Sequence, residues 1–150
     1  MASQAQASAT PVVLTKDYIR DAFKLLEEVD DLSQRNSFFE KFVVPNVKWE
    51  ITGTAHDMAG TRHNLADHSA ASFDKLGKKL SKPIKFVVRS VILEAETRWA
   101  SIECQGFTTR LNGKPYQNDY VWLTEWNDEG KIFHVRSYHD THLAEIVLHE

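Results

Sequence analysis

The chain has 150 residues, a formal net charge of −3, 42% hydrophobic residues and 26% charged residues. This length is most simply one domain with a sizeable core. The interspersed charges include neither the basic patch of a nucleic-acid-binding protein nor a charged tail. No stretch approaches the roughly 18 apolar residues that span a bilayer. We therefore expect neither nucleic acid nor a membrane as a partner.

The first ten residues are rich in Ala, Ser and Gln. They lack the positive region and the apolar region of a secretory signal. We expect a disordered leader over residues 1–14, a single domain over residues 15–150 and a cytoplasmic location. The one cysteine, Cys104, lies in a strand-like run and is expected to be a buried, unreactive thiol.

Three helices are expected in the first half of the chain. The first spans residues 15–29, because apolar residues recur there at spacings of three and four after a capping threonine. A second helix begins at Ser33 and is stopped by Pro45. A third begins at Asn64 and ends near Gly77, where basic residues follow.

Strands dominate the second half of the chain. A short strand at residues 47–51 precedes a loop at residues 54–63, and Asn112-Gly113 is a strong hairpin signal. Four longer strands are expected, at residues 86–93, 99–109, 116–126 and 132–138. Residues 141–149 are expected to form a short helix or an ordered tail.

This order predicts an α+β fold with helices on one face of a curved sheet. Apolar residues occur at both odd and even positions along the strands, so both faces of the sheet are expected to be covered. The face without helices is expected to meet a second subunit.

The last predicted strand ends in three proton-exchanging side chains, Tyr138, His139 and Asp140. A carboxylate at the end of an apolar strand is costly to bury unless its pKa rises or it is hydrogen-bonded. That environment suits a general base. The alternative, which the residues alone favour, is that Asp140 caps a helix beginning at Thr141.

One face of the third long strand carries polar and aromatic side chains, because side chains alternate along a strand. The polar atoms must find hydrogen bonds, either from a ligand or, more commonly, from a neighbouring strand. On the next strand, His134 and Tyr138 share the parity of Asp140 and are expected to project with it, unless a bulge changes the register. The residues on the third strand are Tyr116, Asn118, Tyr120 and Trp122.

His56 lies in the predicted loop and titrates near neutral pH, so it can exchange a proton. A histidine on the surface of a loop is nevertheless the more usual case. Residues 139–142 include several side chains of the kinds that bind metals. Adjacent strand residues point to opposite faces, however, and the residue spacing typical of a zinc site is not present. No Gly-x-Ser-x-Gly elbow and no glycine-rich phosphate loop is present. We expect neither a metal nor a cofactor.

Four motifs, in order along residues 15–145, resemble those of the SnoaL-like family in the nuclear transport factor 2-like superfamily. The first is Trp49-Glu-Ile-Thr-Gly53, and the second is the Gly-Thr-Ala-His-Asp-Met-Ala-Gly-Thr loop that contains His56. The third is Gly113-Lys-Pro-Tyr-Gln-Asn-Asp-Tyr120. The fourth is Asp128-Glu-Gly-Lys-Ile132, which leads to Tyr138-His-Asp-Thr141.

The resemblance implies a cone, in which a strongly curved antiparallel sheet and three helices enclose a pocket (an α+β barrel or cystatin-like roll). It also implies a homodimer through the outer sheet face. The implied activity is that of a cofactor-independent cyclase, isomerase or dehydratase. Its substrate would be a small apolar carbonyl compound, such as a polyketide or terpenoid intermediate of secondary metabolism.

By motif position, Asp140 is the closest match to an acid/base aspartate and His56 to a recurring loop histidine. Asp140 is then expected to remove a proton next to a carbonyl, while His56 or Tyr120 donates a hydrogen bond to the oxyanion. The expected substrate-binding residues are Tyr120, Asn118, Tyr116, Trp122, Trp49, Tyr138 and His134.

The chain also departs from its enzymatic relatives. Its first strand has Trp49, Glu50 and Ile51, with no aspartate like that of ketosteroid isomerases. The superfamily includes non-catalytic proteins, so a dimeric ligand-binding or scaffold protein is the alternative.

Overall fold

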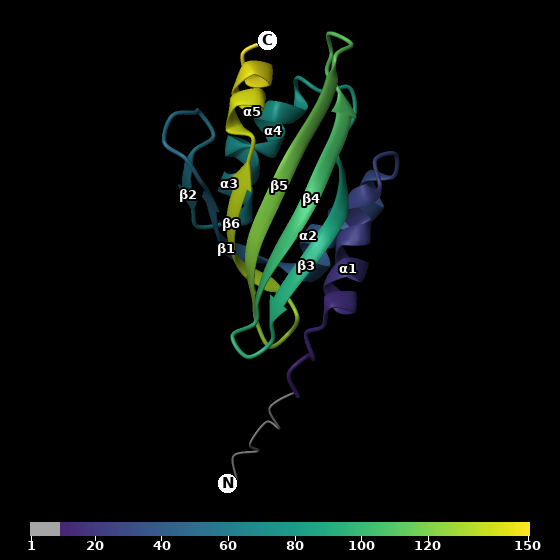
Figure 1. Ribbon diagram of the computed structural model, residues 1–150, viewed down its shortest axis with the longest axis vertical. Helices are drawn as coiled ribbons and strands as arrows, with labels where there is room; N and C mark the ends of the chain where they lie inside the picture. Colours follow the sequence, from purple (N-terminus) through teal and green to yellow (C-terminus); the bar gives the residue numbers. More distant parts are fainter. Residues whose placement is uncertain (1–9) are drawn as a thin grey trace, which may run out of the picture.

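The computed structural model describes residues 10–150, which form one curved, unclosed six-stranded sheet with helices packed against it (Figure 1). The strand order is β2-β1-β6-β5-β4-β3. Neighbouring strands are antiparallel except for β1 and β6, which are parallel and make the sheet mixed. The strands are β1 (Val43–Ile51), β2 (Gly60–Arg62), β3 (Lys85–Glu94), β4 (Trp99–Thr109), β5 (Pro115–Trp126) and β6 (Ile132–His139).

The helices begin where local capping residues are available. The side chains of Thr15, Asp31 and Asn64 each accept hydrogen bonds from backbone N–H groups in the first turn that follows. None of the helices in residues 10–150 is long and apolar enough to cross a membrane. The helices are α1 (Lys16–Phe23), the 3₁₀ helix η1 (Lys24–Glu27), α2 (Leu32–Phe42), α3 (Leu65–Ala71), α4 (Phe73–Gly77) and α5 (Thr141–Leu148).

The α+β prediction is confirmed, with local corrections. Pro45 does not stop the second helix but lies inside β1, where the pairing with β6 shifts register between Val43 and Lys48. Proline has no N–H to donate to a sheet, so an irregularity there is expected. The predicted loop 54–63 contains β2, which pairs with the end of β1. The third predicted helix is divided at Ser72, whose φ of −132° and ψ of −84° are not helical.

The predicted leader also needs correction at its C-terminal end. The N–H of Val12 donates to the carbonyl of Asp128 at 2.8 Å, and Arg98 Nη1 donates to the carbonyl of Val12 at 2.9 Å. Leu14 is buried in the core. The remainder of the predicted leader, residues 1–9, lies outside the described residues.

One face of the sheet, called here the inner face, packs on the helices. Trp122 of β5 meets Phe23 of α1 and Trp49 of β1 edge to face, with ring centroids 5.7 Å and 5.0 Å apart. Figure 1 shows α1 beside β3 at one edge of the sheet, and α5 continuing from the end of β6 next to α4. The inner face therefore carries the core, and the opposite outer face has no helix on it among residues 10–150.

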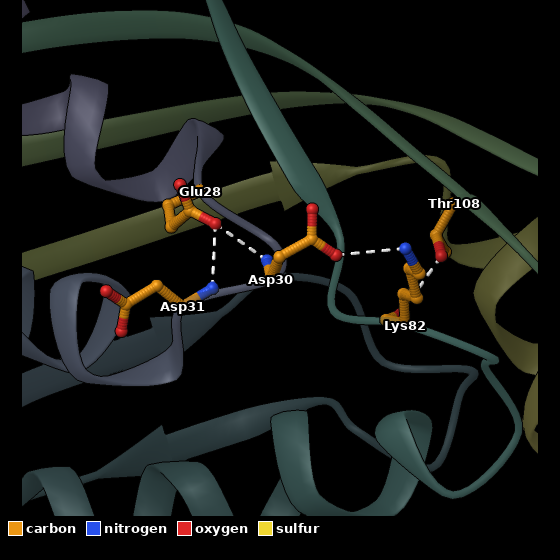
Figure 2. A network of polar contacts seen from close by, with 5 residues as sticks. All are labelled: Glu28, Asp30, Asp31, Lys82 and Thr108. Carbon is orange, nitrogen blue, oxygen red and sulfur yellow. Dashed lines mark hydrogen bonds and ion pairs between the residues drawn. The ribbon is translucent and has the colours of Figure 1, made fainter.

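A polar network joins the turn between η1 and α2 to the segment that precedes β3 (Figure 2). One carboxylate oxygen of Glu28 accepts the backbone N–H groups of Asp30 and Asp31, each at 2.7 Å. Asp30 in turn pairs with Lys82 Nζ at 3.0 Å, and Thr108 Oγ1 donates to the Lys82 carbonyl at 3.0 Å. The network links the helical layer to β4 at the rim of a groove described below.

Candidate functional site

A small cavity of about 40 Å³ lies between the inner face of the sheet and helices α3 and α4. Its wall is mostly apolar, and among the described residues no Asp, Glu, Lys or Arg lines it. A charged ligand would therefore be bound without a counter-charge, which is unfavourable in an apolar site. The polar residues in the wall are His68, Ser72, Tyr120, Ser137 and His139.

His68 is a buried histidine on α3 that faces the cavity. Its ring is stacked on the indole of Trp49, with centroids 3.9 Å apart and planes 14° apart. Its Nε2 lies 3.4 Å from Ser72 Oγ, while its Nδ1 is buried without a hydrogen-bond partner. Burial, with a smaller contribution from Arg62, lowers the pKa of His68 to about 3.

His139 is the second histidine of the cavity and ends β6. It is paired in register with Tyr120 of β5, and the two rings are stacked at 5.4 Å. Its Nε2 is buried and has no hydrogen-bond partner. Burial, and to a smaller extent the neighbouring His56, lowers the pKa of His139 to about 4, whereas Asp140 acts in the opposite direction. Both cavity histidines are therefore neutral at neutral pH.

His56 lies behind His139 and does not line the cavity. The two rings meet edge to face, with centroids 5.9 Å apart. His56 Nε2 lies 2.7 Å from the carbonyl of Thr52, so this nitrogen is the donor. Gly53 has a φ of +104°, and a Cβ there would come within 2.8 Å of His56 Nε2, so the loop requires glycine to hold the imidazole.

Asp140 caps α5, the alternative that the sequence favoured. Its carboxylate accepts the N–H of Leu143 at 3.1 Å, the residue is exposed, and it does not line the cavity. This geometry supports the capping role and gives no support to a general-base role in the cavity.

The polar residues of β5 form a buried network. Tyr116 Oη and Tyr120 Oη are 2.6 Å apart, and Asn118 Nδ2 donates to Tyr116 Oη at 3.0 Å. Asn118 also holds the backbone of Asp140, donating to its carbonyl and accepting from its N–H, both at 3.0 Å. Burial raises the pKa of Tyr116, and that of Tyr120 well above its ordinary value.

The residues expected to bind substrate fall into three groups: residues that line the cavity, inner-face residues that bond to one another, and two residues on the outer face. Tyr120, Trp122 and Trp49 line the cavity. Tyr116 and Asn118 share the inner face but satisfy one another's polar atoms.

His134 and Tyr138 are placed differently from the prediction, because both project to the outer face. His134 Nε2 pairs with Glu50 at 2.6 Å, and Tyr138 is 45% exposed. The prediction that they project with the ligand-facing residues is wrong. In the observed register, Ser137 and His139 of β6 lie opposite the inner-face residues Trp122 and Tyr120.

The sequence reading missed His68 and Ser72. They follow Leu65 at helical spacing, three and seven positions later, so His68 and Ser72, the C-cap residue of α3, lie on the same side as Leu65. That spacing was the available signal. His139 was noticed in the strand-end motif but was not assigned to the site.

A larger groove of about 450 Å³ adjoins the cavity, between α2, α4 and the start of β3. Phe73, Leu76 and Ile84 line both spaces, so these three apolar side chains separate them. Arg35 lines the groove, with its guanidinium 5.8 Å from the Phe86 ring, and burial lowers the pKa of Arg35 to about 10. The groove is therefore separated from the cavity by one layer of apolar side chains.

Other reactive groups do not line the cavity. Cys104 is buried, and burial, with Glu103, raises the pKa of its thiol to about 12, as expected for an unreactive cysteine. Among residues 10–150, the one group with metal-ligand proximity is Asp57, Glu145 and His149. His149 Nε2 is 2.9 Å from each carboxylate, so these three side chains already contact one another on the surface.

No protein-family model and no curated protein matches this sequence. Solved structures share its fold. An NTF2-like protein of unknown function from Burkholderia pseudomallei has a TM-score of 0.67 at 12% identity, covering 89% of this chain and 96% of that one. TerC, co-crystallized with polyporic acid, has a TM-score of 0.64 at 16% identity, covering 89% and 97%.

A third solved structure is that of SalBIII, described as an epoxide hydrolase/cyclase-like enzyme in pyran ring formation in the polyether salinomycin. It has a TM-score of 0.62 at 15% identity, covering 85% of this chain and 91% of that one. The expected resemblance is confirmed for the fold.

Proposed function

We propose that this chain, which has the NTF2-like fold, is a cofactor-independent acid/base enzyme. Its substrate would be a small apolar carbonyl compound, such as a polyketide or terpenoid intermediate, and the reaction an isomerisation, cyclisation or dehydration. The observation that carries the proposal is the apolar cavity in which His139 Nε2 is buried without a partner. The shared fold with a cyclase-like enzyme adds support.

His139 takes the place of Asp140 as the proposed general base. A neutral imidazole with its proton on Nδ1 accepts the proton of a carbon next to the carbonyl at Nε2, which leaves an enolate. The resulting imidazolium is unstable in an apolar cavity, so it returns the proton readily. Return to a different carbon gives isomerisation, whereas return to a departing hydroxyl releases water.

Tyr120 is the proposed donor to the enolate oxygen. Asn118 donates to Tyr116 Oη, and Tyr116 can donate in turn to Tyr120 Oη. In this chain of hydrogen bonds, Tyr116 Oη accepts from Asn118 and donates to Tyr120 Oη. The Tyr120 hydroxyl then accepts one hydrogen bond, and its own proton is left for the ligand. The raised pKa values of both tyrosines keep the hydroxyls protonated. Donors that are already oriented stabilise developing charge without reorganisation.

His56 and Asp140 are assigned positioning roles in this proposal. The His56 and His139 rings pack edge to face, and His56 itself is held by Thr52. Asp140 fixes the chain reversal at the end of β6 by capping α5 and by its backbone contacts with Asn118. Both therefore set the orientation of His139 without touching the substrate.

The substrate would approach through the groove. The cavity of about 40 Å³ is far below the roughly 300–1,000 Å³ of ordinary small-molecule sites. Binding therefore requires that Phe73, Leu76 and Ile84 move aside and join the two spaces. Their side chains make no hydrogen bonds, so their displacement breaks only packing contacts.

A panel of small enones and β-hydroxy ketones tests the proposal, beginning with the conversion of 3-cyclohexenone to 2-cyclohexenone followed by absorbance. His139→Phe should lower kcat about 100-fold or more, the usual contribution of a general acid/base. Asp140→Asn retains a capping side chain and should keep most of the activity. Retained turnover in His139→Phe would remove the assignment, and loss in Asp140→Asn alone would return the role to Asp140.

The small size of the cavity favours the alternative of a non-catalytic ligand-binding or scaffold protein. In either case we propose a homodimer through the outer face. Trp99, Val121 and Leu123 are only partly buried there, and Arg136 lies 5.4 Å over the Trp99 ring. Tyr138→Arg should convert a dimer to monomer in light scattering, while Lys48→Arg should not. A monomeric parent protein would contradict the dimer.

A further inference from the structure

The protonation state of the His68 ring follows from its neighbours. Ser72 Oγ lies 2.6 Å from the His68 carbonyl and donates its only proton to that oxygen. It can then only accept at the 3.4 Å contact with His68 Nε2. Because His68 is neutral, with one ring proton, that proton belongs on Nε2. Nδ1 is left as a bare acceptor, buried and without a partner.

Among the described residues, no donor of the cavity wall is hydrogen-bonded to this acceptor. Ser72 is committed to the His68 carbonyl, and the Trp49 indole N–H donates to Ser137 Oγ at 3.1 Å. Ser137 itself donates to the Glu50 carbonyl at 3.4 Å. The Tyr120 hydroxyl is hydrogen-bonded to Tyr116, and its own proton is the one assigned above to the carbonyl end of the ligand.

Buried acceptors in folded proteins are nearly always satisfied. A neutral acceptor in an apolar wall is complementary to an O–H group. Carboxylates and carbonyls offer no proton, and an ammonium group would lack a counter-charge there. A water molecule can meet the same need until a ligand hydroxyl replaces it.

We infer that His68 Nδ1 accepts a hydrogen bond from a hydroxyl or enol of the ligand, so that this site selects neutral hydroxy-carbonyl compounds over simple ketones. The inference rests on the proposed function, in which His139 acts at the carbonyl end of the same molecule. His68 thereby becomes a specificity-determining residue, held flat by Trp49 and oriented by Ser72.

The tautomer is tested directly by long-range ¹H–¹⁵N NMR on the wild-type protein labelled with ¹⁵N-histidine. The spectrum should show a protonated Nε2 and a bare Nδ1 for His68 at neutral pH. The Nδ1 resonance should shift when 4-hydroxyacetophenone is added and stay in place with 4-fluoroacetophenone. A proton on Nδ1 in the ligand-free protein would overturn the inference, whatever the variants do.

Selectivity is tested by calorimetric titration with the same two probes, which differ by a hydroxyl and a fluorine of similar size. The hydroxyl compound should bind about three- to tenfold more tightly, the usual range for one hydrogen bond. His68→Phe keeps an aromatic ring on Trp49 but has no acceptor, so the ratio should fall to about one. His142→Phe, an exposed histidine on α5, should leave the ratio unchanged.

The outcomes separate the two proposals. Equal affinity for both probes in the wild-type protein overturns the assignment to His68 and leaves the acid/base proposal at His139 intact. Binding of neither probe overturns both. A preference for the hydroxyl compound that survives in folded His68→Phe places the acceptor elsewhere and also overturns the inference.

Discussion

The imidazole of His68 lies flat on the indole of Trp49, with ring centroids 3.9 Å apart. The contact joins α3 to β1 and removes one face of the imidazole from water. Burial makes the charged form of such a ring unfavourable. His139, packed between Tyr120 and His56, is affected in the same way. The two cavity histidines therefore link stability to pH.

Acid should destabilise the protein well before its carboxylates titrate. The folded pKa values of about 3 for His68 and about 4 for His139 lie below the ordinary 6.5. Between these limits the unfolded chain binds more protons, so stability is complete above pH 6.5 and falls as the pH is lowered toward 4. Each histidine should contribute a slope of about 1.4 kcal/mol per pH unit.

Urea unfolding between pH 7.5 and 5 measures this slope. His68→Phe and His139→Phe should each remove about half of it. Two variants that keep the full wild-type slope would show that neither histidine is held neutral by the fold.

Asp140 should behave as a helix cap. Asp140→Ala removes the acceptor for the Leu143 N–H and should lower the free energy of unfolding by about 1 kcal/mol. Asp140→Asn keeps an acceptor and should cost less than about 0.5 kcal/mol. Thermal denaturation of both variants checks the order, and equal losses would argue against the cap.

Asn118 should be intolerant of an acid. Asn118→Asp replaces an amide that donates to Tyr116 Oη and to the Asp140 carbonyl by a group that can only accept when ionised. We expect a loss of about 3 kcal/mol in urea unfolding, because a buried charge would face a carbonyl oxygen. Gln117→Glu, the same change at the exposed neighbouring residue of β5, should be nearly neutral.

Gly106 should be required for the position of Tyr120. A Cβ at Gly106 would lie 2.8 Å from both the Tyr120 ring and the Ile84 side chain. Gly106→Ala should therefore lower stability by about 1–3 kcal/mol, as overpacking does. Gly77→Ala is the matched control, because its Cβ would meet nothing within 4 Å, and it should stabilise by about 0.5 kcal/mol. The reverse order in thermal unfolding would contradict the packing at this strand.

Phe73 should limit access to the cavity, because it lines both the cavity and the groove. Phe73→Ala should accelerate binding of 4-hydroxyacetophenone, measured by stopped-flow quenching of tryptophan fluorescence. Lys75→Ala supplies the control, because Lys75 is an exposed residue of α4 that lines neither space. An unchanged association rate in Phe73→Ala would mean that the ligand enters by another path.

The succession of strands along the second half of the chain, and most of their boundaries, followed from local patterns. The predicted strand 99–109 coincides with β4, and Gly113 adopts a φ of +85° in the predicted hairpin turn. Asn64 begins the third helix, as expected. These features depend on residues close in sequence, because strand alternation, helix capping and turn conformation each involve only a few neighbouring positions.

The cavity chemistry depended instead on contacts between distant segments. His68 and Trp49 meet because α3 packs on β1, and His139 faces inward because its register pairs it with Tyr120. His134 and Tyr138 were expected on the ligand side but lie on the outer face, because alternation along β6 does not specify which of its faces turns to the helices.

The sequence by itself determined the succession of helices and strands, the capping residues and the family resemblance that points to the fold. Only the tertiary structure decided which titratable groups share an apolar cavity and which are satisfied elsewhere. The reason is physical: a cap or turn is stabilised by adjacent backbone, whereas burial and hydrogen-bond satisfaction depend on every element that packs around a side chain. Asp140 is satisfied locally by α5, and the unpartnered nitrogens of His68 and His139 are created by the packed fold.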